Sequence, residues 1–118
     1  MKKHLATPTL LLAALLSLST PAAAVANSMI GAGTFQCGEW TEARAGRGNG
    51  KLFVEMAQSW VQGYMSAINL FADAGKDVTL PSVTVTSAYL DKWCAANPLK
   101  EVYLGSSALI GELRAQRR

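Results

Sequence analysis

Histidine is almost missing from this sequence, and cysteine and charge are scarce. The 118 residues include one histidine, His4, two cysteines and 16% charged residues. Beyond His4 this excludes a hydrolytic triad or a zinc site built on histidine. A redox pair would show the Cys-x-x-Cys spacing, which Cys37 and Cys94 do not have. We therefore expect no catalytic residue, no metal ligand and no cofactor, and hence no enzyme.

Two other patterns are too weak to indicate chemistry. The stretch from Gly46 to Lys51 looks superficially like a phosphate-binding loop, but Leu52 follows where a magnesium-binding hydroxyl is needed. Two carboxylate pairs at helix-compatible spacing are typical of a solvated helix face: Glu39 with Glu42, and Asp73 with Asp77.

The first 26 residues have the pattern of a signal peptide. Two lysines precede an apolar stretch, Leu10 to Leu18, and small residues then offer cleavage after Ala24 or after Ala26, of which we favour the second. A membrane anchor is the alternative, but a spanning helix needs roughly 20 predominantly apolar residues, and this stretch is shorter. We expect a product exported to the periplasm, without stable membrane insertion.

Charge in the mature chain is nearly balanced. Removing residues 1–26 leaves 92 residues, with nine basic residues of the original eleven against eight acidic ones. A clustered basic face for nucleic acid is therefore not expected, because only Arg114, Arg117 and Arg118 gather, at the end of the chain. A chain of this length forms one domain, residues 27–118.

Both cysteines lie in the mature part. An exported chain enters an oxidising compartment, and two cysteines allow one intramolecular pairing, Cys37 with Cys94. Closing a loop of about 58 residues removes unfolded-state entropy worth roughly 4 kcal/mol. We expect a structural disulfide.

Apolar residues recur at three- and four-residue steps from Lys51 to Ala74, which predicts a long helix with one buried face. Gly75 and Pro81 make the following segment a loop. The residues expected on the buried face are Phe53, Met56, Ala57, Trp60, Tyr64, Ala67, Ile68 and Phe71.

Two further helices are expected downstream. Thr86 is the predicted N-cap of the second helix, and Asn97-Pro98 is predicted to end it and to start a third helix that continues past Leu113. The runs 78–80 and 83–85 have strand propensity but are too short to change the class. The predicted fold is all-α, a small domain of three to four helices closed by one disulfide. The buried stripe of the second helix would contain Leu90, Trp93 and Cys94, with Tyr89 alongside.

Large aromatic residues are frequent for so short a chain. Most are expected in the core, and Trp40 and Trp93 lie close to the cysteines in sequence, which favours a packed cluster around the disulfide. The alternative is that some rings form a partner-binding surface, because aromatic anchors dominate interfaces. The residues proposed for that role are Trp40, Trp60, Tyr64 and Trp93. Arg44 and Asn69 have two interpretations, as loop caps or as ligand-binding groups, and the first is the commoner.

Three segments resemble the HdeA family: Thr34–Trp40, Trp60–Tyr64 and Val85–Cys94. This resemblance implies a small exported helical protein with one disulfide that acts as an acid-stress chaperone and works as a dimer. The family has strongly charged terminal segments, whereas Asn27 to Phe35 here is uncharged. The pattern of a cysteine, Asn-Pro and a last amphipathic helix also resembles periplasmic immunity proteins that neutralise amidases, which usually have more cysteines.

Two functions are therefore expected, both by protein binding. The first is an acid-activated holdase that suppresses aggregation, because protonation of the eight mature carboxylates would leave a strongly positive chain whose self-repulsion loosens the core. The second is an inhibitor, immunity or adaptor protein that recognises one envelope or secreted partner through exposed aromatic residues. A homodimer is compatible with either function.

Overall fold

The computed structural model describes residues 28–48 and 50–117 and is all-helical within them. A short 3-10 turn, η1 (Ala32–Thr34), precedes four helices: α1 (Cys37–Arg44), α2 (Gly50–Leu70), α3 (Val83–Ala96) and α4 (Val102–Gln116). The predicted all-α class with one disulfide is confirmed. The predicted signal peptide, residues 1–26, lies outside the described residues. No helix in the described part combines the length and the apolar character needed to cross a membrane.

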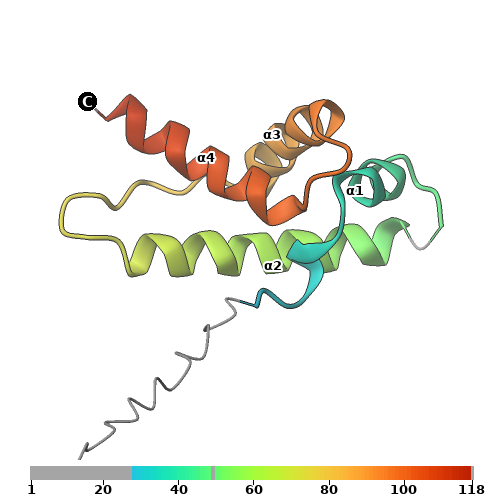
Figure 1. Cartoon of the computed structure of the whole chain (residues 1–118), viewed down its shortest axis with the longest axis horizontal. Coiled ribbons are helices and arrows are strands. Elements are labelled where there is room, and N and C mark those ends of the chain that lie inside the picture. Colours follow the sequence, from blue (N-terminus) through green and yellow to red (C-terminus); the bar gives the residue numbers. More distant parts are fainter. Residues whose placement is uncertain (1–27, 49, 118) are drawn as a thin grey trace, which may run out of the picture.

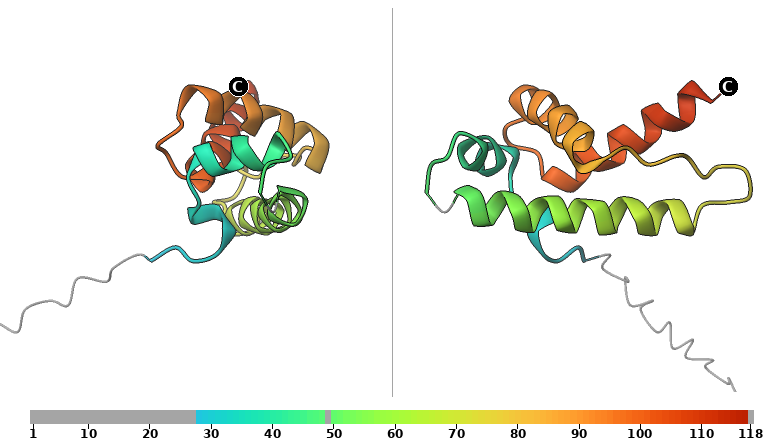
Figure 2. Two further views of the ribbon diagram at one scale, coloured as in Figure 1. Left: turned by 90° about the vertical axis from the view of Figure 1, so that its right-hand side faces the viewer. Right: turned by 180° about the vertical axis from the view of Figure 1, so that it is seen from behind.

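Helix α2 forms one side of the domain, and α1, α3 and α4 pack against it from the other side (Figure 1). The two further views show the same arrangement, with η1 crossing α2 on its way to α1 (Figure 2). The core lies between these helices. Its largest fully buried side chains include Trp40, Met65, Leu90 and Ile110.

The long helix predicted over 51–74 is present as α2, but it ends four residues earlier, at Leu70, and its buried face was predicted incorrectly. The buried residues of α2 are Gly50, Ala57, Val61 and Met65, and of these only Ala57 was predicted to be buried. Met56 and Phe71, predicted to be inside, are exposed. Apolar residues occupy more than one face of α2, so that spacing alone does not tell which face meets the other helices.

Helix α1 begins where the chain after η1 pairs with the segment before α4. The amide of Cys37 donates to the carbonyl of Lys100 at 2.7 Å, and the amide of Val102 donates to the carbonyl of Phe35 at 3.0 Å. Gln36 and Glu39 form a capping box at the start of α1, in which the backbone amide of Gln36 donates to Glu39 Oε2 at 2.8 Å. These bonds satisfy backbone groups that a helix start leaves unpaired.

Helix α3 begins earlier than predicted. Ser82 is its N-cap and accepts from the amide of Val85 at 3.4 Å, so the run 83–85 with strand propensity is the first turn of a helix. The prediction of Thr86 as the N-cap is wrong. Thr86 is 1% exposed inside α3, and its hydroxyl has no hydrogen-bond partner among the described residues.

Helix α4 begins later than predicted. Asn97 is the C-cap of α3, and its Nδ2 donates to the carbonyl of Trp93 at 2.8 Å. A turn then leads to Val102, the first residue of α4. The Asn97-Pro98 pair therefore ends one helix without starting the next, because the backbone from Pro98 to Val102 pairs with the segment before α1.

Segment 71–82 connects α2 to α3, and Asn69 at the end of α2 holds it by two hydrogen bonds. Asn69 Nδ2 donates to the carbonyl of Val78 at 2.9 Å, and the amide of Val78 donates to Asn69 Oδ1 at 2.7 Å. Asn69 is thus a loop cap, the commoner of its two predicted roles. We use the term loop end for segment 71–82 together with the C-terminal turns of α2 and α4 beside it (Figure 1).

Candidate functional site

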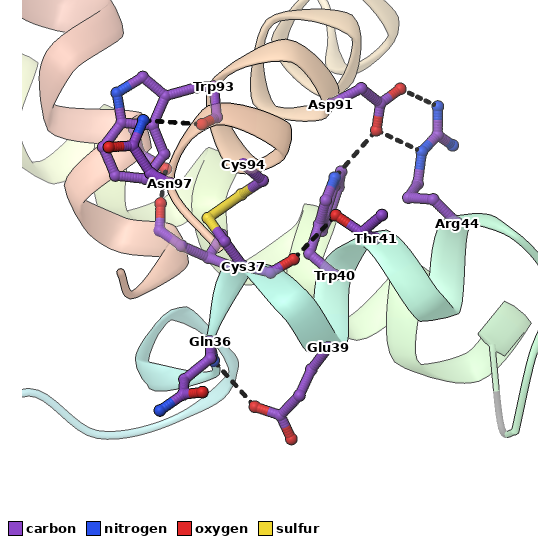
Figure 3. The surroundings of a disulfide bond; sticks show 12 residues. Gln36, Cys37, Glu39, Trp40, Thr41, Arg44, Asp91, Trp93, Cys94 and Asn97 are labelled. Atoms are coloured by element: carbon purple, nitrogen blue, oxygen red, sulfur yellow. Dashed lines mark hydrogen bonds and ion pairs between the residues drawn. A yellow bond between two sulfur atoms is a disulfide. The ribbon is translucent and has the colours of Figure 1, made fainter. Parts of the chain in front are cut away.

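The disulfide joins the first residue of α1 to the C-terminal part of α3. Cys37 and Cys94 are both fully buried and their Cα atoms are 4.7 Å apart. Trp40, one turn after Cys37, is also fully buried, and its Nε1 donates to Asp91 Oδ1 at 2.9 Å (Figure 3). Trp40 therefore belongs to the packed cluster around the disulfide and has no surface to offer a partner in this conformation. We call this region, α1 with the C-terminal half of α3, the disulfide end.

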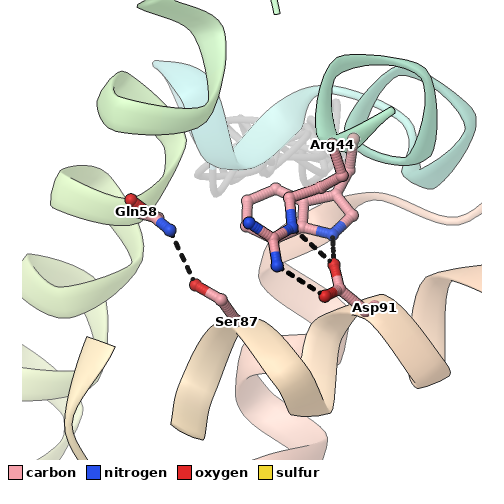
Figure 4. Close-up of polar contacts among 5 residues, drawn as sticks. Arg44, Gln58, Ser87 and Asp91 are labelled. Carbon is pink, nitrogen blue, oxygen red and sulfur yellow. Dashed lines mark hydrogen bonds and ion pairs between the residues drawn. The ribbon is translucent and has the colours of Figure 1, made fainter. Parts of the chain in front are cut away.

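Asp91 connects α3 to α1 through two partners. Arg44 donates from Nε to Asp91 Oδ1 at 2.8 Å and from Nη2 to Oδ2 at 2.7 Å (Figure 4), and Trp40 Nε1 donates to the same Oδ1. The hydrogen bonds from Arg44 lower the pKa of Asp91; partial burial opposes this, and the bond from Trp40 adds to the lowering. Arg44 therefore pairs two helices, and its side chain is 37% exposed, so it neither caps a loop nor lies buried.

The side chain of Trp93 on α3 packs against α4. It is half-buried and packs over Gly105, where a Cβ atom would lie 2.7 Å from the indole. Glycine at this position therefore lets the two helices approach closely. Of the residues predicted to bind a partner, Trp93 is thus used mainly in internal packing.

Trp60 and Tyr64 lie on α2 and continue into a row of rings. Trp60 stacks on Tyr64 with centroids 5.0 Å apart, and Tyr64 meets the edge of Tyr103 at 6.1 Å. The Tyr64 hydroxyl is 2.8 Å from the hydroxyl of Ser107 on α4. Tyr64, the middle ring of this row, is held by both neighbouring rings and by Ser107 and is therefore mainly structural, whereas Trp60 also lines a surface hollow.

The N-terminal segment before α1 lies directly on Trp60. Trp60 Nε1 donates to the carbonyl of Ile30 at 2.9 Å. A Cβ atom at Gly33 would lie 2.0 Å from the Trp60 ring, so only glycine allows this approach. The indole is therefore held from both sides, by the N-terminal segment and by Tyr64.

An exposed apolar surface surrounds the outer edge of Trp60. Leu52 is 61% exposed and Met56 is 50% exposed, and both line a shallow hollow of about 620 Å³ with Trp60. Ile30, whose carbonyl binds Trp60, is 81% exposed at its edge. We call Ile30, Leu52, Met56 and Trp60 the outer patch. Glu55 is the one charged residue that lines the hollow.

Sequence reasoning found Trp60 but missed the rest of the outer patch. Met56 was assigned to the buried face, and Leu52 and Ile30 were not considered. The signal was the position of Leu52 and Met56 four residues apart, which places both on one helix face away from Val61 and Met65.

The described residues contain no group of three or more histidine, cysteine, aspartate or glutamate side chains able to hold a metal ion. Glu39 and Glu42, and likewise Asp73 and Asp77, are exposed. No protein-family model, curated protein or solved structure matches this chain.

Proposed function

We propose that this protein is an exported, periplasmic polypeptide-binding protein of the HdeA type that holds apolar segments of other proteins on the outer patch. The observation that carries this proposal is the exposure of Ile30, Leu52 and Met56 around an indole that is already fixed in place. Exposed apolar groups gathered at one place mark interaction sites on small domains.

The chemistry of the patch suits varied clients. Met56 is unbranched and flexible and adapts to different apolar groups. Trp60 is rigid, because its ring is packed against Gly33 and stacked on Tyr64. A rigid aromatic anchor beside an adaptable methionine binds apolar side chains without demanding one sequence. This combination supports a holdase that suppresses aggregation.

Acid activation is supported by the link between Asp91 and Arg44. Protonation of Asp91 at low pH removes a contact between α1 and α3, and protonation of the other carboxylates leaves the chain strongly positive. The disulfide keeps α1 attached to α3. Acid would therefore loosen the helices without releasing the chain, and would add apolar surface to the outer patch.

A single dedicated partner is the second candidate, as expected for an inhibitor, immunity or adaptor protein. It is supported by the exposure of the outer patch in the folded domain, which requires no opening step. A homodimer stays a prediction, which sedimentation velocity of the mature protein at neutral pH would test.

An aggregation assay with a denatured client at about pH 2 and pH 7 tests the proposal. We expect the mature protein to suppress aggregation at acid pH and more weakly at neutral pH. Leu52→Ser with Met56→Ser should weaken protection several-fold at both pH values, because two apolar contacts are lost. Leu99→Ser is the matched control, since Leu99 is 82% exposed on the turn before α4.

The outcomes separate the two candidates. Equal protection by the patch variant and the unchanged protein would exclude the outer patch as the binding surface. No protection at either pH, together with one protein retained at neutral pH by the unchanged chain and lost with the patch variant, would establish the dedicated partner instead. Mass spectrometry of the exported protein tests the predicted start at Asn27.

A further inference from the structure

The loop end lies at the opposite end of the domain from α1 (Figure 1). It carries a second group of exposed apolar and charged side chains. Leu70, the last residue of α2, is 78% exposed, and Phe71, which follows it, is 83% exposed. Exposure of a phenylalanine side chain to water is unfavourable, and the described chain leaves most of this one uncovered.

Phe71 shares its surroundings with two basic side chains. A hollow of about 300 Å³ is lined by the apolar residues Ile68, Phe71 and Ala72 and by the charged residues Asp73, Lys76 and Arg114. An adjoining hollow of about 360 Å³ is lined by Gly75, Lys76, Arg114 and Arg117. The loop end is therefore apolar at Phe71 and basic at Arg114 and Arg117.

The two arginines have no carboxylate partner among the described residues. Arg114 uses its Nε, which donates to the carbonyl of Lys76 at 3.0 Å, and this bond holds the guanidinium over segment 71–82. Lys76 pairs with Asp73 at 2.6 Å, so these two charges balance locally. Asp77 lines a hollow beside Arg117 and is the remaining acidic residue there.

The charge of the loop end differs from that of the rest of the domain. Three basic residues and two acidic ones lie at the loop end, and Arg118 follows in sequence. The other described residues include five basic and six acidic side chains. The loop end thus has one more basic than acidic residue, whereas the other described residues have one more acidic than basic residue.

This surface is held in shape before any ligand arrives. Asn69 fixes Val78 by two hydrogen bonds, and Arg114 fixes Lys76. The amide of Lys76 donates to the carbonyl of Asp73 at 2.9 Å across a turn in which Gly75 has a φ of 77°. A pre-formed surface loses less conformational entropy on binding.

We propose that the loop end is a peripheral binding surface for membranes rich in anionic phospholipid. Arg114 and Arg117 bind lipid phosphates, for which the guanidinium group has matching geometry, and Phe71 with Leu70 enters the boundary between headgroups and acyl chains. Each cation contributes about fivefold in affinity near an anionic surface. Binding is therefore reversible and weakened by salt.

Co-sedimentation of the full mature protein with vesicles tests this surface. We expect binding to vesicles of phosphatidylglycerol mixed with phosphatidylcholine, little binding to phosphatidylcholine alone, and loss of binding in about 0.5 M salt. Phe71→Ser should lower the partition coefficient about tenfold. Arg117→Glu, a change of two charges, should lower it roughly 30-fold.

Matched controls come from the opposite end of the domain. Leu99 is 82% exposed and is followed by Lys100, so Leu99→Ser and Lys100→Glu make the same chemical changes away from the loop end. Both should bind as the unchanged protein does. All four positions are exposed, so circular dichroism should show the same helix content in every variant.

Four results would overturn the proposal: no binding to anionic vesicles, equal binding to both vesicle types, full binding by Phe71→Ser and Arg117→Glu, or equal losses in the controls. Binding of a short-chain anionic amphiphile without binding of vesicles would also overturn it, in favour of a soluble ligand. The outer-patch variant Leu52→Ser with Met56→Ser should keep vesicle binding, so this test is separate from the aggregation assay.

Discussion

At the disulfide end, a covalent bond, a fully buried indole and paired backbone segments hold α1 to α3, whereas at the loop end two side chains hold segment 71–82 through hydrogen bonds to its backbone. The first region buries Trp40, Leu90 and the disulfide completely, and the second leaves Phe71 83% exposed. The comparison teaches that the most tightly held region and an exposed apolar surface lie at different ends of this domain. One end supplies the fold, and the other can change its surface at little cost to the fold.

Removing the disulfide tests the first half of this comparison and should have the largest effect. The double variant Cys37→Ser with Cys94→Ser should lose about 4 kcal/mol of unfolding free energy, because the unfolded chain regains the freedom of a long loop. Urea unfolding measured by tryptophan fluorescence would show it. A loss below about 1 kcal/mol would mean that noncovalent packing alone holds the disulfide end.

Asn69→Ala tests the second half and should have an intermediate effect. Loss of both hydrogen bonds to Val78 should cost about 2 kcal/mol. We expect this loss of stability to appear mainly as faster hydrogen exchange of the Val78 amide and faster proteolysis of segment 71–82. Asn97→Ala is the matched control, since Asn97 also donates to a backbone carbonyl but lies next to the disulfide. Equal opening of both ends in the two variants would break the comparison.

Asp91→Asn should have the smallest effect and should depend on pH. The pKa of Asp91 is lowered in the folded protein, so its contribution is present above the unfolded value of about 3.9 and is lost as pH falls through the folded pKa. The pair with Arg44 is more than one third exposed, so we expect less than about 1 kcal/mol at pH 7. Urea unfolding between pH 2 and pH 7 should show the two proteins converging in acid. A constant difference across that range would contradict this assignment.

The sequence predicted the parts of the fold that depend on long patterns. The presence of the long helix α2, the disulfide and the all-α class follow from periodicity, two cysteines and length. The predicted helix starts were wrong where contacts with distant parts of the chain determine where a helix begins. The run from Val83 to Val85 has strand propensity, yet it forms the first turn of α3 because Ser82 caps the helix there. Asn97 ends α3, and α4 does not begin at once because the chain after Asn97 pairs with the segment before α1.

The candidate site was harder to predict than the fold. The sequence analysis proposed both Trp40 and Trp60 for partner binding and could not separate them. In the structure Trp40 lies one turn from Cys37 and is buried with it, whereas Trp60 lies under the N-terminal segment. Which side of α2 is buried depends on the positions of the other three helices. Exposure of Met56 and Phe71 therefore could not be read from spacing along α2 alone.

The close approach of Gly33 to Trp60 also bears on how related chains should vary. Any side chain at Gly33 would collide with the indole, so this pair can change only together or not at all. Met56 and Phe71 carry no such constraint, since both are largely exposed and the fold would tolerate polar residues there. In related sequences, retention of this glycine would therefore reflect only inheritance of the fold. Retention of apolar residues at Met56 or at Phe71 would instead reflect selection for the binding role proposed for each surface.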